Sequence, residues 1–265
     1  MTSELTLEPR EGGDARPLPV PSRLATLASK LVLFPLLIAQ GKQVRSVALK
    51  LPEAAGERQG VAGAGRVGLR VLIVGDSSAA GVGVGTQDEA FAGQLAQALA
   101  ERTGAAVGWQ LVATSGHTAA DAARALTGAA LAPADLLVTA LGVNDVVSQT
   151  RPAAFLKALD EIHALAITRA QVTHSWHCGL PPMATFPLLP QPLRWILGRD
   201  AAHLDNALVN HLAGQTARLH LPLPEAPHVP GKNDSTPEGW MARDGFHPGL
   251  LGYRQWGRQV AEAIG

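Results

Sequence analysis

The sequence has a single cysteine, Cys178, and no net formal charge, because 22 Lys and Arg residues balance 22 Asp and Glu residues. One cysteine cannot form an internal disulfide, so a disulfide-stabilised scaffold is excluded. Without a surplus of cations the chain cannot displace phosphate counterions strongly, and we expect no nucleic-acid partner. The lone cysteine fits a reducing compartment. We therefore favour a cytoplasmic or membrane-associated location, with export as the alternative.

Long hydrophobic runs are also scarce. Residues 31–39 form an apolar run of nine residues with Pro35 at its centre, whereas a membrane-spanning helix needs about 20. Basic residues lie on both sides of the run, at Lys30, Lys42, Arg45 and Lys50. Three interpretations stay open for residues 24–50: an arm that docks on the rest of the protein, peripheral contact with a membrane surface, or a signal or anchor sequence.

The overall composition is that of a globular protein. Hydrophobic residues make up 46% of the chain and charged residues 17%, which supplies enough apolar material for a sizeable core. Residues 1–23 are polar and proline-containing, and residues 52–68 contain five glycines and few large side chains. We interpret the latter stretch as a linker. The sequence therefore predicts an N-terminal extension over residues 1–68 and a domain over residues 69–265.

Strand and helix patterns alternate from residue 69 onward. Short apolar or β-branched runs predict strands at residues 71–74, 109–113, 135–141 and 171–175. Apolar residues at helical spacing predict helices near residues 91–99, 121–126, 156–166 and 253–264. This alternation indicates a parallel sheet with helices on both faces. Ligands of such sheets bind beyond the carboxyl ends of the strands.

Residues that could act as nucleophile, base or hydrogen-bond donor lie just after the predicted strands and near the C-terminus. The four motifs are Gly75-Asp76-Ser77, Ser115-Gly116, Gly142-Val143-Asn144-Asp145 and Asp244-Gly245-Phe246-His247-Pro248. A serine hydroxyl becomes a good nucleophile when a neighbouring base takes its proton. His247 can be that base, because imidazole titrates near neutral pH. Asp244 precedes it by three residues, so one tight turn can bring the carboxylate to the imidazole.

In this order, the four motifs resemble those of the SGNH hydrolase superfamily, also called the GDSL esterases and lipases. The resemblance covers residues 69–265, and Ser78 stands where the family name has leucine. It implies a three-layer α/β/α sandwich with a mostly parallel, flavodoxin-like sheet. It also implies ester hydrolysis without a metal or organic cofactor. The implied catalytic residues are Ser77, Asp244 and His247, and the implied oxyanion hole consists of the backbone N–H groups of Ser77 and Gly116 and the side-chain amide of Asn144.

We therefore expect a serine esterase that forms an acyl-enzyme on Ser77 and accepts a small-molecule or lipid-like ester. Thioesterases, lysophospholipases, carbohydrate deacetylases and acyltransferases use the same groups, so these activities stay open. A catalytically silent, membrane-associated protein is a remote alternative, against which the intact set of motifs argues.

Three other features have structural or functional interpretations. The glycines at positions 81, 83 and 85 lack the spacing of a phosphate-binding loop, so we expect a flexible loop beside the nucleophile. His174, His177 and Cys178 match no closed zinc site, and we expect no metal. Apolar residues between positions 180 and 196 either line the substrate cleft or pack on the core, and the sequence does not choose between these two interpretations.

Overall fold

The computed structural model describes residues 23–186, 188–227 and 237–265. Within these residues, six strands form one sheet in the order β1-β3-β2-β4-β5-β6. The strands are β1 (Gln59–Ala62), β2 (Val67–Gly75), β3 (Ala106–Ala113), β4 (Leu136–Ala140), β5 (His174–Cys178) and β6 (Arg218–Leu221). Neighbouring strands are parallel, except that β1 pairs with β3 in the antiparallel direction. The sheet is therefore mostly parallel, as the alternation of elements predicts.

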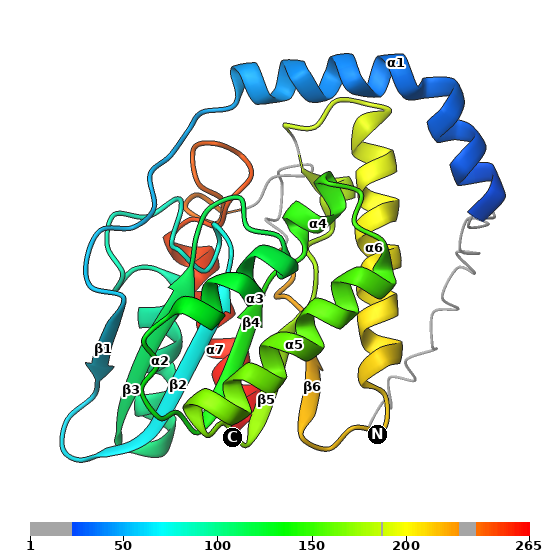
Figure 1. Ribbon diagram of the computed structural model, residues 1–265. Helices are drawn as coiled ribbons and strands as arrows, with labels where there is room; N and C mark the ends of the chain where they lie inside the picture. The colour runs from blue at the N-terminus through cyan, green and yellow to red at the C-terminus, as the bar shows by residue number, and fades with distance from the viewer. Residues whose placement is uncertain (1–22, 187, 228–236) are drawn as a thin grey trace, which may run out of the picture.

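Helices cover both faces of the sheet (Figure 1). One face packs against α2 (Phe91–Thr103) and α7 (Leu250–Ile264), and the other against α3 (Ala119–Gly128), α5 (Pro152–Ala170) and α6 (Leu193–Leu212). Successive residues of β2 point to opposite faces, so Val71 and Ile73 join one apolar cluster while Leu72 and Val74 join the other. This burial on both faces explains why the strand is continuously apolar. The three-layer α/β/α sandwich implied by the resemblance is confirmed.

Capping residues explain where several helices and strands begin and end. The helix predicted from residue 91 ends at Gly104, which adopts a left-handed conformation and whose N–H bonds to the carbonyl of Ala100. Helix α3 begins with a capping box in which Thr118 and Asp121 each bond to the other's backbone N–H. The strand predicted at residues 171–175 begins later, at His174, because Gln171 caps α5 with a left-handed conformation.

The stretch interpreted as a linker is partly structured. Residues 59–62 form β1, and β2 begins at Val67, before the predicted boundary. Gly60 packs so closely on Trp109 that a Cβ at this position would lie 2.9 Å from the indole. The contact with β3, rather than any local preference, therefore creates this strand. The division of the chain at residues 68 and 69 stays a prediction, although the sheet contains residues from both sides of it.

The hydrophobic run belongs to a long helix, α1 (Arg23–Val47), which continues through Pro35. Figure 1 shows this helix crossing above the edge of the sheet at which the parallel strands end. Lys30 forms an ion pair with Asp200 at 2.7 Å, and Gln40 donates to the carbonyl of Gln191. The described helices include none whose length and apolar character would let it cross a membrane. The predicted polar segment lies outside the described residues, except for Arg23, at which α1 begins.

Candidate active site

Ser77 lies in the tight turn that follows strand β2. Gly75 ends the strand, and a Cβ there would lie 2.3 Å from the methyl group of Ala79 and 2.8 Å from the carbonyl oxygen of Ala140. Only glycine fits so close an approach. The backbone N–H of Asp76 then donates to Ala140 of the neighbouring strand at 3.1 Å. The turn is therefore fixed to the sheet, and Ser77 follows at its carboxyl edge.

A serine, a histidine and an aspartate are connected by hydrogen bonds at this edge. Ser77 Oγ lies 2.8 Å from His247 Nε2, and His247 Nδ1 lies 2.6 Å from Asp244 Oδ2. The carboxylate can only accept, so Nδ1 carries the hydrogen and Nε2 is free to accept the serine proton. The structure thus brings together the three side chains that the sequence analysis predicts.

The loop that carries Asp244 and His247 is held by its own hydrogen bonds. Asp244 Oδ1 accepts the backbone N–H groups of Phe246 and His247, each at 3.0 Å. Burial raises the pKa of the Asp244 carboxyl, but hydrogen bonds from the side chain and backbone of His247 outweigh burial, and the net effect lowers the pKa. Asp244 therefore stays ionised near neutral pH, as an orienting carboxylate requires.

The glycines after the nucleophile serve close packing. Gly83 has a φ of +111°, and a Cβ there would lie 2.5 Å from the carbonyl oxygen of Pro248. Tyr253 donates from its hydroxyl to the carbonyl of Val82 at 2.7 Å, and both residues are buried. The segment after Ser77 is therefore packed against the segment after His247. The expectation of a flexible loop is replaced by a close-packed contact, because chain segments distant in sequence meet here.

The three predicted oxyanion donors lie on adjacent strand ends. Gly116 has a φ of +87°, and no heavy atom lies within 4 Å of the position its Cβ would occupy. In the described part of the chain, the backbone N–H groups of Gly116 and Ser77 have no hydrogen-bond acceptor. Asn144 Nδ2 donates to the carbonyl of His117 at 3.0 Å and lies 3.3 Å from Asp76 Oδ2. These two contacts fix the orientation of the Asn144 amide, and the oxyanion role of the three donors stays a prediction.

Two buried carboxyl groups, those of Asp76 and Asp145, lie next to these residues in the sequence and bond to nearby backbone. Asp76 accepts the N–H of Ser78, and Asp145 accepts the N–H of Ala119 at the start of α3. Burial raises the pKa of Asp76 to about 6, although the N–H of Ser78 and the nearby His247 act in the opposite direction. Burial also raises the pKa of Asp145. Asp76 also accepts from Asn144 Nδ2, so both carboxyls connect neighbouring turns.

A carboxylate from the supposed linker reaches the same site. Glu53 Oε1 accepts the backbone N–H of Ser115 at 2.6 Å, and its Oε2 accepts from Arg58 Nη2 at 2.5 Å. Partial burial opposes ionisation of Glu53, but the bonds from Ser115 and Arg58 outweigh it and lower the pKa. Sequence analysis missed this residue because nothing local to residues 52–68 shows that they contact residue 115.

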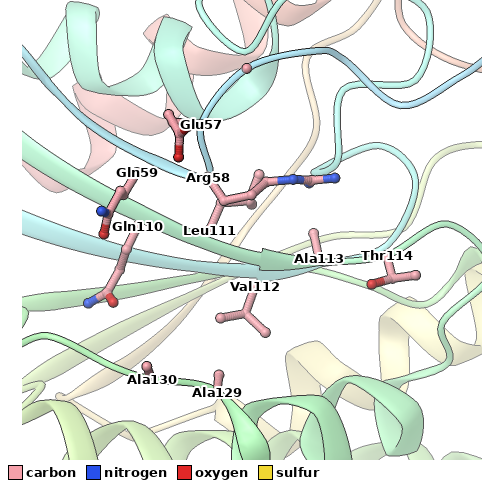
Figure 2. Close-up of a pocket in the computed structure, with 11 residues that line it drawn as sticks. Glu57, Arg58, Gln59, Gln110, Leu111, Val112, Ala113, Thr114, Ala129 and Ala130 are labelled. Atoms are coloured by element: carbon pink, nitrogen blue, oxygen red, sulfur yellow. The ribbon is translucent and has the colours of Figure 1, made fainter.

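A cavity of about 420 Å³ is lined by Arg58, the partner of Glu53, and by residues of strands β1 and β3. Figure 2 shows Glu57, Arg58 and Gln59 on one side of the strand and Val112, Ala129 and Ala130 on the other. Ser77, Asp244 and His247 do not line the cavity, and its nearest point in sequence to the oxyanion donors is Thr114. The cavity is therefore separate from the hydrogen-bonded triad.

The apolar segment after β5 packs mainly on the core. Met183, Phe186, Leu189 and Ile196 are buried, whereas the side chain of Trp195 is 37% exposed. Phe186 also packs edge-on against Phe246, with their ring centroids 4.9 Å apart. Of the two interpretations left open, the structure favours core packing, with Phe246 connecting that core to His247.

The histidines around Cys178 form no metal site in the part of the chain that the structure describes. His177 is fully buried, where its Nδ1 lies 2.9 Å from Thr139 Oγ1 and its Nε2 accepts from Arg218. Burial lowers the pKa of His177 to about 3, so the ring is neutral. Burial also raises the pKa of Cys178 to about 12, and the thiol stays protonated.

The fold and the triad define a class: α/β/α proteins that carry a hydrogen-bonded serine, histidine and aspartate at the carboxyl edge of a parallel sheet. Comparison with known proteins gives the family. The profile of the GDSL-like lipase/acylhydrolase family matches residues 73–255. The chain therefore belongs to this family of esterase- and lipase-type hydrolases.

Two individual relatives agree with this assignment. A GDSL-like esterase of Mycobacterium tuberculosis is 26% identical over 187 residues, which is 70% of this chain and 58% of that relative. The match thus spans a little over half of the relative's length. A lipolytic protein of the G-D-S-L family from Veillonella parvula has a similar structure, with a TM-score of 0.53 and 14% identity. That match covers 74% of this chain and 97% of the other, and at this identity it shows the fold alone.

Proposed function

We propose that this chain is a serine esterase that hydrolyses carboxylic esters through an acyl-enzyme on Ser77. The observation that carries the proposal is the pair of hydrogen bonds joining Ser77 Oγ to His247 Nε2 at 2.8 Å and His247 Nδ1 to Asp244 at 2.6 Å. Family membership supports the reaction class, and the esterase named among the relatives supports the choice of ester.

The first half of the reaction acylates the enzyme. Ser77 Oγ attacks the ester carbonyl carbon while its proton passes to His247 Nε2. The carbonyl oxygen becomes an oxyanion, which the N–H groups of Ser77 and Gly116 and the amide of Asn144 stabilise. The bond to the alcohol oxygen then breaks, and the alcohol leaves with the proton from Nε2. Asp244 stabilises the imidazolium throughout without taking the proton itself.

The second half returns the enzyme to its starting state. A water molecule gives a proton to His247 Nε2 and attacks the acyl carbon. The oxyanion forms again on the same three donors, and the proton returns to Ser77 Oγ as the acid departs. Thioester hydrolysis and acyl transfer to another alcohol follow the same proton path, so they remain alternatives that an acceptor and substrate series separates.

Hydrolysis of p-nitrophenyl acetate by three purified proteins tests the proposal. We expect wild type to turn over this ester and Ser77→Ala to lose at least about 10³-fold in kcat, in line with other serine hydrolases. The matched control is Ser148→Ala, since Ser148 is exposed after α4 (Val143–Val147). It should keep wild-type kcat. Equal turnover by wild type and Ser77→Ala would refute the proposal, as would absence of turnover by wild type on esters of every chain length.

A further inference from the structure

Helix α1 presents an apolar surface on its outer side. Its residues 31–38 contain five large hydrophobic side chains that are 42–79% exposed: Leu31, Val32, Phe34, Leu36 and Ile38. We call these five residues the outer face of α1. Val47 at the end of α1 and Leu49 just after it are also exposed, and the remaining exposed large hydrophobic residues of the described chain are scattered over other elements. A contiguous apolar surface of this kind marks an interaction site.

The opposite side of the same helix packs against the rest of the protein. Leu37 and Val44 pack against the core cluster that contains α6. Gln40 both donates to the carbonyl of Gln191 at 2.7 Å and accepts the N–H of Leu193 at 3.2 Å. Because these contacts and the Lys30–Asp200 ion pair fix the rotation of the helix, the outer face cannot turn toward the core.

We propose that the outer face of α1 binds the surface of an anionic lipid bilayer, with the helix lying parallel to the membrane plane. Charge supports this occupant. Residues 23–47 contain four basic residues and no acidic residue, although the whole chain is neutral. Lys42 and Lys50 are exposed and form no ion pair within the described residues. Apolar side chains beside lysines are typical of helices that bind at the interface of anionic membranes.

A second copy of the chain is a poorer fit to this surface. A two-fold symmetric contact would place the outer face of one copy against that of the other. It would bring Lys42 and Lys50 of both copies together without any acidic residue of α1 to offset them. An anionic lipid surface meets both the apolar and the cationic parts of the helix.

Bilayer docking would place the proposed active site near the membrane. Lys30 of α1 donates to Gln149 at 2.8 Å, and α4, which carries Asn144, ends two residues before Gln149. Leu37 packs against the same core cluster as Phe246, the neighbour of His247. Figure 1 shows α1 above the side of the sheet at which the parallel strands end, and Ser77 follows one of these strands, β2. The binding itself does not depend on catalysis; only the further consequence, access to esters held in the bilayer, rests on the proposed function.

Co-sedimentation with lipid vesicles tests the apolar part of the proposal. The full chain is mixed with vesicles of phosphatidylcholine alone or with phosphatidylglycerol added. We expect binding to the anionic vesicles, and we expect Leu31→Ser/Val32→Ser/Phe34→Ser to lower the partition coefficient by about tenfold or more. The matched control is Val61→Ser/Val209→Ser/Leu219→Ser, which removes three exposed apolar residues from other elements. It should bind as wild type does.

A second pair of variants tests the charges. Lys42→Gln/Lys50→Gln should lower binding to anionic vesicles about 25-fold, since each lysine near such a surface contributes about fivefold. Lys157→Gln/Arg254→Gln, which removes two exposed cations from α5 and α7, should change it little. Circular dichroism and turnover of a soluble ester confirm that each variant is folded.

The Ser77→Ala variant should bind vesicles as wild type does, so loss of catalysis and loss of docking are read separately. Equal binding by wild type and the triple outer-face variant would overturn the proposal. A second result would also overturn it: wild type does not bind vesicles, is dimeric by light scattering, and becomes monomeric with the same triple substitution. The outer face would then bind a second copy of the chain. Equal affinity for neutral and anionic vesicles would contradict the anionic bilayer that we propose.

Discussion

Ser77 and His247 are 170 positions apart in the sequence, yet their reacting atoms lie 2.8 Å apart. Each residue is held by a local device: a glycine that ends a strand positions the serine, and a carboxylate that accepts two backbone N–H groups positions the histidine. These devices are visible in the sequence because they lie within a few residues of the group they position. The meeting of Ser77, Asp244 and His247 could therefore be predicted from the sequence, whereas the oxyanion role of Gly116 and Asn144 follows from the family resemblance and stays a prediction.

Substitution of Asn144 tests the predicted oxyanion hole. Asn144→Ala removes the side-chain donor, and removal of one such donor costs about 2.7–4 kcal/mol of transition-state stabilisation in other enzymes. We expect kcat on p-nitrophenyl acetate to fall about 10²–10³-fold with little change in KM, because the donor acts mainly on the developing oxyanion. The exposed Asn206→Ala is the control. A near-normal kcat in Asn144→Ala would remove Asn144 from this role.

Asp76 predicts a dependence of stability on pH. Burial raises its pKa from 3.8 to about 6, so between these values the folded protein binds a proton that the unfolded chain has lost. Folding then becomes less favourable as pH rises through this window, by about 3 kcal/mol in total. The free energy of unfolding of wild type relative to Asp76→Asn should therefore fall by that amount from pH 4 to pH 7.

Urea titrations at a series of pH values measure this difference. The exposed Asp88→Asn serves as the control and should run parallel to wild type across the series. A difference between wild type and Asp76→Asn that stays constant with pH, or that changes in the opposite direction, would contradict the raised pKa.

Elements with a strong apolar pattern were predictable, and those made by tertiary contact were not. Strands β2, β3 and β4 are continuously or alternately apolar, and all three appear near the predicted positions. Strand β1 contains two small residues beside two polar or β-branched ones and exists because β3 offers it an edge. Strand β6 (Arg218–Leu221) has only four residues, with a buried arginine, and its partner β5 supplies the pairing. Strand β1 has no apolar periodicity, and the polar–apolar alternation of β6 runs over only four residues, which is too short to indicate a strand reliably.

The Glu53 contact gives a prediction at the scale of elements. This side chain connects the segment before β1 to the turn after β3 through its 2.6 Å bond to the N–H of Ser115, next to Gly116. Glu53→Ala should leave that turn unsupported and lower kcat about tenfold, roughly the contribution of one hydrogen bond to a charged group. KM should change little, because Glu53 bonds to the turn beside Gly116, a predicted oxyanion donor, and is not itself among the predicted site residues.

Two further variants distinguish a role of Glu53 in positioning the turn at Ser115 from a general loss of protein stability. Glu53→Gln retains an acceptor for Ser115 and should recover part of the lost kcat, whereas Glu57→Ala, an exposed neighbour, should behave as wild type. If Glu53→Ala lowers the free energy of unfolding but leaves kcat unchanged, the residue has a structural role only.

At the scale of the whole molecule, one sheet separates two apolar cores and gathers the candidate site along one edge. The turns after β2, β3 and β4 carry Ser77, Gly116 and Asn144 respectively, because parallel strands end at the same side of a sheet. The loop before α7 adds His247 from the far end of the chain. The predicted parallel sheet and the family resemblance together indicated this convergence. It could not predict that α1 would extend over the same edge, since its orientation depends on contacts with α6.

Covalent labelling with a fluorophosphonate, followed by mass mapping of peptides, tests the central claim most directly, because only an activated serine reacts rapidly. We predict one adduct, located on Ser77, in wild type and in Ser78→Ala, and no adduct in Ser77→Ala. An adduct on a different serine, or undiminished labelling of Ser77→Ala, would contradict the account.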